Sequence, residues 1–178
     1  MATLQLELRS VLVVPVAGVP AAVDEWRERT CNAKPSGGIP AHITVLFPFV
    51  PAAELDAARI AEVEALFGDV RGFDFQLREL RAFPRILYLA PEPDAPFALL
   101  TRTMIERYPE YPPYGGAHGE VVPHLTVAEG DQRTLEIART AIAPSLPVSA
   151  RCEELLLLAE AARGRWTERA RIALASAQ

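Results

Sequence analysis

The feature that most constrains the fold is a four-residue pattern that occurs twice, His-Ile-Thr-Val at 42–45 and His-Leu-Thr-Val at 124–127. Two of the chain's three histidines open these two motifs. Successive side chains of a β-strand point to opposite faces, so each motif predicts a strand with one apolar face and one face that carries His and Thr. The apolar face suits a protein core, and the His-Thr face suits a groove. The chain must therefore bury one side of each strand and leave both histidines accessible.

The segments around the two motifs follow the same order: strand, helix, motif strand, helix, strand. Apolar or alternating runs predict strands at 10–16, 41–49, 73–80, 85–91, 121–129, within 148–161 and at 165–175. Helical spacing of apolar residues predicts helices at 20–33, 51–67, 94–108 and 131–143. The order indicates an internal duplication, with approximate half-repeats at 1–82 and 83–178 and the last strand as an addition. Helices on one side of each sheet place the chain in the α+β class, and 178 residues fit a single domain or two small lobes that share a core.

The net charge of the chain argues against binding of long nucleic acid. The formal net charge is −5, which is the wrong sign for many phosphate contacts, whereas a small nucleotide or one RNA end in a local positive pocket is compatible with it. On the helix predicted at 20–33, Val23 and Trp26 are expected on the core face, and Arg27 and Arg29 outside. Two local groups of arginines are expected to form a solvated, charged rim: Arg78, Arg81 and Arg85, and Arg163, Arg165, Arg169 and Arg171.

Cysteine usage and the N-terminal region indicate a cytoplasmic protein that does not enter a membrane. Cys31 and Cys152 form no Cys-x-x-Cys pair and are predicted to be buried free thiols. The apolar run at 11–23 is interrupted by Pro15 and Pro20 and is too short to span a bilayer as a helix.

The two motifs carry the residue types that phosphoester chemistry needs. If the halves are related by a two-fold axis, His42 and His124 face each other across a cleft with Thr44 and Thr126. One neutral imidazole can take a proton from the attacking water or hydroxyl, and one charged imidazole can give a proton to the leaving oxygen. The hydroxyl groups can donate hydrogen bonds to phosphate oxygens. Such a set requires no metal ion.

Other chemistries are less well supported. The nearest acidic neighbour of a motif histidine, Glu129, has the wrong strand parity relative to His124, so a zinc site is not expected. There is no Gly-x-Ser-x-Gly pattern, and neither cysteine lies near a motif. His118 is expected in a solvent-exposed loop. Tyr111 and Tyr114 either stack on a base or serve packing, and the glycine-containing loops before the motifs either approach a phosphate or are simple connections.

The paired motifs, their separation of 82 residues, the order of elements and a tryptophan-bearing strand near the end resemble the 2H phosphoesterase superfamily. This superfamily includes the bacterial 2′-5′ RNA ligase-like proteins and the cyclic phosphodiesterases, and the likeness covers nearly the whole chain. It implies a bilobal fold with pseudo-two-fold symmetry, in which two antiparallel-rich sheets face a central cleft with helices outside. It also implies His42 and His124 as the acid–base pair, with Thr44 and Thr126 as the phosphate-binding residues.

The resemblance implies a reaction and a class of substrate. Members open a 2′,3′-cyclic phosphate on an RNA 3′ end or a small nucleotide, usually to a 2′-phosphate, and some join RNA ends through a 2′-5′ link. In this chain Ala128 and Gly130 are expected on the same face as Thr126, where they offer the substrate no charged contact. The expected partners are a small cyclic nucleotide or an RNA 3′ end with a cyclic phosphate, with no long duplex, no cofactor, and a monomeric protein. The alternatives are a non-catalytic module that binds nucleotides or RNA ends, and a purely structural domain. The sequence assigns neither the acid nor the base.

Overall fold

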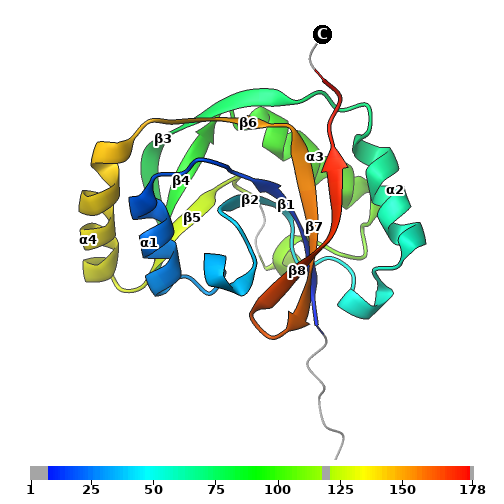
Figure 1. Ribbon diagram of the computed structural model, residues 1–178, viewed down its shortest axis with the longest axis horizontal. Helices are drawn as coiled ribbons and strands as arrows, with labels where there is room; N and C mark the ends of the chain where they lie inside the picture. The colour runs from blue at the N-terminus through cyan, green and yellow to red at the C-terminus, as the bar shows by residue number, and fades with distance from the viewer. Residues whose placement is uncertain (1–7, 118–120, 177–178) are drawn as a thin grey trace, which may run out of the picture.

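Two four-stranded antiparallel sheets form the framework of the part of the chain that the computed structural model describes, residues 8–117 and 121–176 (Figure 1). The first sheet has the order β2 (His42–Leu46), β1 (Ser10–Pro15), β7 (Glu154–Ala162) and β8 (Arg165–Ala173). The second has the order β5 (Leu125–Glu129), β4 (Ile86–Glu92), β3 (Phe73–Phe83) and β6 (Val148–Cys152).

The two sheets are built to the same plan, which confirms the predicted α+β fold with two antiparallel sheets. Each sheet has a motif strand at its edge, β2 or β5, and each motif strand pairs with the strand that precedes it in its half, β1 or β4. Both sheets take strands from either side of residue 82, because β3 joins the second sheet, and β7 and β8 join the first. The half-repeat boundaries therefore stay a prediction.

Four helices of the described chain flank the sheets: α1 (Ala21–Thr30), α2 (Ala57–Phe67), α3 (Ala95–Arg107) and α4 (Gln132–Ile142). Figure 1 shows α1 and α4 side by side at one end of the molecule, and α2 and α3 at the other. The helix that leads into each motif strand packs against the motif strand of the opposite sheet, α1 against β5 and α3 against β2. The two lobes are thereby interlocked at their motif strands.

Several predicted elements differ from the structure at their boundaries; the strand predicted at 121–129, for example, begins only at Leu125. The first helix ends at Thr30 rather than near residue 33, because Cys31 already has extended backbone angles. The second helix begins only after Asp56, whose side chain accepts a hydrogen bond from the backbone N–H of Arg59 and caps it. The segment 148–161 is two strands in different sheets: β6 is buried only at its two ends, whereas residues 155–160 of β7 are all buried.

The apolar side chains of both motifs lie in the core. Ile43, Val45, Leu125 and Val127 are all buried within one hydrophobic cluster that joins the two sheets and the helices. Both cysteines are free and buried, as predicted. Within the described ranges, no helix combines the length and the apolar character needed to cross a membrane.

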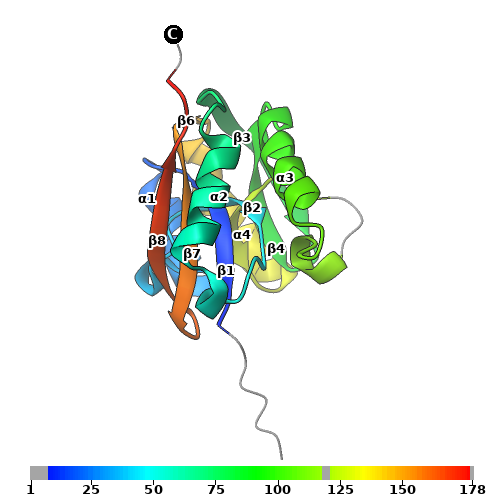
Figure 2. The same ribbon diagram turned by 90° about the vertical axis from the view of Figure 1, so that its right-hand side faces the viewer.

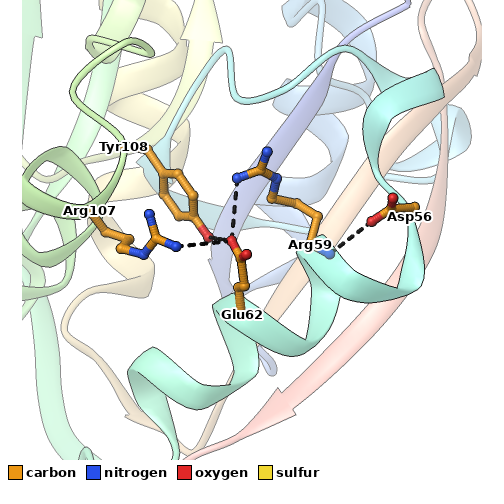
Figure 3. A network of polar contacts seen from close by, with 5 residues as sticks. All are labelled: Asp56, Arg59, Glu62, Arg107 and Tyr108. Carbon is orange, nitrogen blue, oxygen red and sulfur yellow. Dashed lines mark hydrogen bonds and ion pairs between the residues drawn. The ribbon is translucent and has the colours of Figure 1, made fainter.

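At the end of the molecule opposite α1 and α4, a polar network ties α2 to the end of α3 (Figures 2 and 3). The Glu62 carboxylate accepts hydrogen bonds from Arg59 at 3.3 Å, from Arg107 at 3.2 Å and from the Tyr108 hydroxyl at 3.1 Å. The Tyr108 ring packs edge-to-face on Phe49 in the core, with ring centroids 5.0 Å apart. The network therefore anchors the α2–α3 contact to the core, away from the motif histidines.

Candidate active site

All four residues predicted from the motifs line one cavity of about 630 Å³. His42 and Thr44 come from β2, Thr126 comes from β5, and His124 directly precedes β5. All four are half-buried, whereas the apolar residues between them are buried in the core. The structure thus brings together two edge strands whose His-Thr faces open onto the same space.

Both motif strands carry a β-bulge at the same place. In β2 the pairing with β1 shifts so that Val45 is an extra residue, and in β5 the pairing with β4 shifts so that Val127 is extra. A bulge changes which residues share a face. As a result, Phe47 and Glu129, each three residues after a motif threonine, line the cavity.

The bulge in β5 overturns two expectations that rested on simple alternation. Ala128 is buried in the core rather than on the face of Thr126, and Glu129 lies in the cavity despite its parity. The Glu129 carboxylate accepts hydrogen bonds from the backbone N–H and the side-chain amide of Asn32, at 3.4 and 3.1 Å. Among residues 8–117 and 121–176, no group of three or more His, Cys, Asp or Glu side chains is arranged to hold a metal ion.

The two histidine rings are held in the same way. Nδ1 of His42 lies 2.8 Å from the carbonyl oxygen of Pro40, and Nδ1 of His124 lies 2.7 Å from that of Val122. A carbonyl only accepts hydrogen bonds, so these contacts assign the ring proton to Nδ1 in both neutral imidazoles. Nε2 is then the nitrogen of each ring that is available for proton transfer.

The surroundings of the two rings lower the pKa of both. Burial, the positive charge of Arg27 and the proximity of His124 lower the pKa of His42 from 6.5 to about 4, against the effect of the bond to Pro40. Burial also lowers the pKa of His124, against the effect of the bond to Val122. Both rings are therefore neutral in the free protein at neutral pH.

A buried arginine that the sequence reasoning placed outside lies behind the two motifs. Arg27 has only 1% of its surface exposed, because it follows Val23 by four residues and so shares the buried face of α1. Its guanidinium donates to the carbonyl oxygens of Thr126 at 2.9 Å, Pro40 at 2.9 Å and Ala33 at 3.1 Å. The spacing of Val23 and Arg27 on the helix thus indicated that Arg27 is buried, but its charge favoured a position at the surface.

Two aromatic rings hold His124 from the side of the second sheet. Phe83 and Tyr88 stack on each other with centroids 4.3 Å apart, and His124 contacts both edge-to-face at 5.3 and 5.4 Å. Neither ring belongs to a motif. The pairing of β3 with β4 and of β4 with β5 puts these residues beside the histidine, so only the sheet register could have revealed them.

Further groups complete the wall of the cavity. Arg9 forms a two-pronged ion pair with the buried Glu160, at 2.7 and 3.0 Å. Phe47 contacts Trp166 edge-to-face at 6.2 Å. Tyr114, which lies at positive φ, faces the cavity and forms a hydrogen bond with Thr44.

The open questions about the tyrosines and glycines are resolved in part. Tyr111 packs edge-to-face on Phe49 with centroids 5.6 Å apart. In the first glycine loop, a Cβ on Gly37 or Gly38 would lie 2.6 Å from the Gly164 oxygen or 2.3 Å from the Trp166 oxygen. These glycines therefore permit close packing against the β7–β8 hairpin. His118 lies outside the described residues.

Comparison with known proteins agrees with the fold and the motifs. The family model of the 2′-5′ RNA ligase superfamily matches residues 14–164, and the chain belongs to this superfamily, as its 2H phosphoesterase motifs predicted. No curated protein sequence matches the chain significantly.

Solved structures show the same fold at low sequence identity. E. coli LigT complexed with 3′-AMP superposes with a TM-score of 0.56 at 20% identity, over 94% of this chain and 98% of LigT. E. coli LigT complexed with NADP+ gives a TM-score of 0.53 at 21% identity, over the same shares. A protein of Thermus thermophilus gives a TM-score of 0.56 at 19% identity, over 93% of this chain and 97% of that protein.

Proposed function

We propose that the protein is a metal-independent phosphodiesterase that opens 2′,3′-cyclic phosphates of small nucleotides or RNA 3′ ends, using His42 and His124 as acid and base. The observation that carries the proposal is that both rings line one cavity with Nδ1 bonded to a backbone carbonyl. One Nε2 can then accept a proton, and the other can donate one when its ring is protonated. Membership of the 2′-5′ RNA ligase superfamily supports this class of chemistry.

The proposed reaction is an acid–base displacement at phosphorus. The neutral imidazole takes a proton from water, whose oxygen forms a bond to phosphorus. The bond from phosphorus to the ribose 3′-oxygen breaks, and the second imidazole gives that oxygen a proton, which leaves a 2′-phosphate. Thr44 and Thr126 donate hydrogen bonds to the non-bridging oxygens, where charge builds up. With an RNA 5′-hydroxyl in place of water as the entering group, the same displacement forms a 2′-5′ link.

The charges of the cavity favour a substrate with few phosphates. The described lining residues include three arginines, Arg9, Arg27 and Arg163, and two carboxylates, Glu129 and Glu160, a formal sum of one positive charge when the histidines are neutral. A cyclic phosphodiester carries one negative charge. Long RNA would bring many more to a chain with a net charge of −5. Structures of LigT contain 3′-AMP, NADP+ and ATP, which supports a small nucleotide or a single RNA end as the ligand here.

The test is turnover of nucleoside 2′,3′-cyclic phosphates in the presence of a chelator, with the 2′- and 3′-phosphate products separated by chromatography. We expect a 2′-phosphate, and a loss of about 10²- to 10⁴-fold in kcat for either His42→Ala or His124→Ala. Thr140→Val, on the exposed side of α4, is the control and should keep full activity. Turnover that depends wholly on added metal, or that survives in the double histidine variant, contradicts the proposal.

Binding without turnover would favour the alternative, a non-catalytic module for nucleotides or RNA ends. Tight binding of the cyclic nucleotide by the wild-type protein, with no product above background, is the result that distinguishes it. The monomeric state and the cytoplasmic location stay predictions from the sequence.

A further inference from the structure

The site is built on a nearly symmetric frame that leaves the two histidines interchangeable. Each ring is held through Nδ1 by the carbonyl two residues before it, and each motif strand has a bulge one residue after its threonine. Nothing within the motifs therefore assigns one ring as base and the other as acid. Any difference between them must come from residues outside the motifs.

The two helices that pack on the motif strands differ at one equivalent position. Arg27 is the seventh residue of α1 and Thr101 is the seventh residue of α3. Both side chains are buried, and both bond a carbonyl of the opposite motif strand: Arg27 bonds Thr126, and Thr101 bonds Val45 at 3.0 Å. The frame thus places a permanent cation on one side and a neutral hydroxyl on the other.

The charge of Arg27 acts directly on His42. The Pro40 carbonyl that accepts from Nδ1 of His42 also accepts from the guanidinium of Arg27. Among the described residues, no acidic side chain forms an ion pair with Arg27, and its buried Nε has no hydrogen-bond partner. A buried cation that shares its acceptor with an imidazole disfavours a second positive charge on that ring.

His124 has different neighbours. Its ring lies edge-to-face against the stacked pair Phe83 and Tyr88. Both rings are uncharged, and burial rather than a neighbouring cation lowers the pKa of His124. This side of the cavity therefore lacks the cation that Arg27 places beside His42.

The remaining charged groups of the cavity do not reverse this difference. Arg9 and Glu160 neutralise each other in their ion pair, and Arg163 is exposed to solvent. The charge of Glu129 acts on Arg27 and Cys31, and it is not among the causes that shift the pKa of either histidine. Two other titratable groups stay neutral at physiological pH, because burial raises the pKa of Cys31 to about 11 and also raises that of Tyr114.

We propose that Arg27 is a positioning residue that makes the two histidines differ. Its charge keeps His42 unprotonated as the general base and leaves His124 as the general acid. The assignment of base and acid rests on the proposed function, whereas the effect of Arg27 on the two rings does not. The lowered pKa of His42, to which the charge of Arg27 contributes, agrees with the proposal.

The first experiment needs no substrate. NMR titration of the imidazole resonances is compared in the wild type, Arg27→Met, Arg27→Lys and Thr101→Val. We expect His42 to titrate below His124 in the wild type, and its midpoint to rise by about one pH unit in Arg27→Met while that of His124 stays in place. Arg27→Lys keeps the charge and should keep the low midpoint. Thr101→Val removes the equivalent bond without a charge and should move neither.

Two results overturn the proposal. The first is a wild-type His42 that titrates at or above His124, which is measurable even if every Arg27 variant unfolds. The second is a folded Arg27→Met protein whose His42 midpoint is unchanged.

The second experiment follows kcat/KM for the cyclic phosphate against pH. In Arg27→Met the acidic limb should move upward by the same amount as the His42 midpoint, with the alkaline limb fixed. The opposite pattern of limbs overturns the assignment of base and acid. If the wild type shows no turnover but the NMR result holds, the proposed function fails and the effect of Arg27 stands.

Discussion

Protonation of His42 should make the protein lose stability as the pH falls through the weakly acidic range. The pKa of this ring is about 4 in the folded chain, against 6.5 for an unperturbed histidine. Above pH 7 both states are neutral at this position, and the ring contributes no pH dependence. As the pH falls below 6.5 the unfolded chain takes up the proton first, so folding is penalised until the pH reaches about 4.

The size of the effect follows from the two pKa values. At pH 5 nearly all unfolded chains carry the proton on residue 42 and few folded chains do, which costs about 2 kcal/mol of unfolding free energy. Measurement at pH 5 rather than pH 4 also keeps most carboxylates ionised in both states.

The assay is urea unfolding of the wild type and of His42→Gln at pH 7.5 and pH 5. Glutamine has no charge to gain, so the wild type should lose about 2 kcal/mol more than the variant between the two pH values. Effects of the substitution that do not depend on pH cancel in this double difference. His124→Gln should show a difference of the same sign, because its pKa is also lowered. Equal losses in the wild type and His42→Gln would refute the reasoning and mean that residue 42 is as easily protonated in the folded protein as in water.

Three further predictions concern the pH profile and two local structures. The kcat/KM for a cyclic nucleotide should peak below pH 6.5, because catalysis needs one neutral and one charged motif histidine and the pKa values of both are lowered. A peak near pH 8 would contradict this. Gly38→Ala should lower the free energy of unfolding in urea by about 1–3 kcal/mol, because φ is +87° and the new Cβ would lie 2.3 Å from a carbonyl oxygen of β8. Gly18→Ala is the control and should lower it less, because φ is +70° but the space around the residue is open. Equal losses in the two variants would show that the close contact does not contribute to the cost. Asp131→Ala should cost about 1 kcal/mol in the same assay, because it removes the cap of α4 at the N–H of Thr134, and an unchanged free energy would show that the cap is not stabilising.

Much of the frame could be predicted from the sequence because it depends on local periodicity. Alternation within the motifs placed Ile43 and Leu125 in the core and the histidines at the cavity, since a strand has one possible inside face once the apolar residues are buried. Simple alternation gave the wrong face for Glu129, because a bulge adds a residue to β5 before it. The position of a bulge depends on how the strand pairs with its neighbour, so the sequence of the strand alone does not predict it. The sequence also could not predict that β3 joins the second sheet and β7 the first, because this depends on pairing between strands that are far apart in the chain.

The residues that differentiate the site lie outside the repeated pattern, and this follows from the symmetry itself. Two copies of one motif on one kind of strand receive the same hydrogen bond at Nδ1 and the same bulge, so they supply two equal proton carriers. Hydrolysis needs two rings in different protonation states, one unprotonated at Nε2 and one protonated there. The inequality must then come from the supporting elements, where α1 carries Arg27 at the position at which α3 carries Thr101. A repeat in the sequence therefore locates the site, and the departures from the repeat are where its mechanism should be sought.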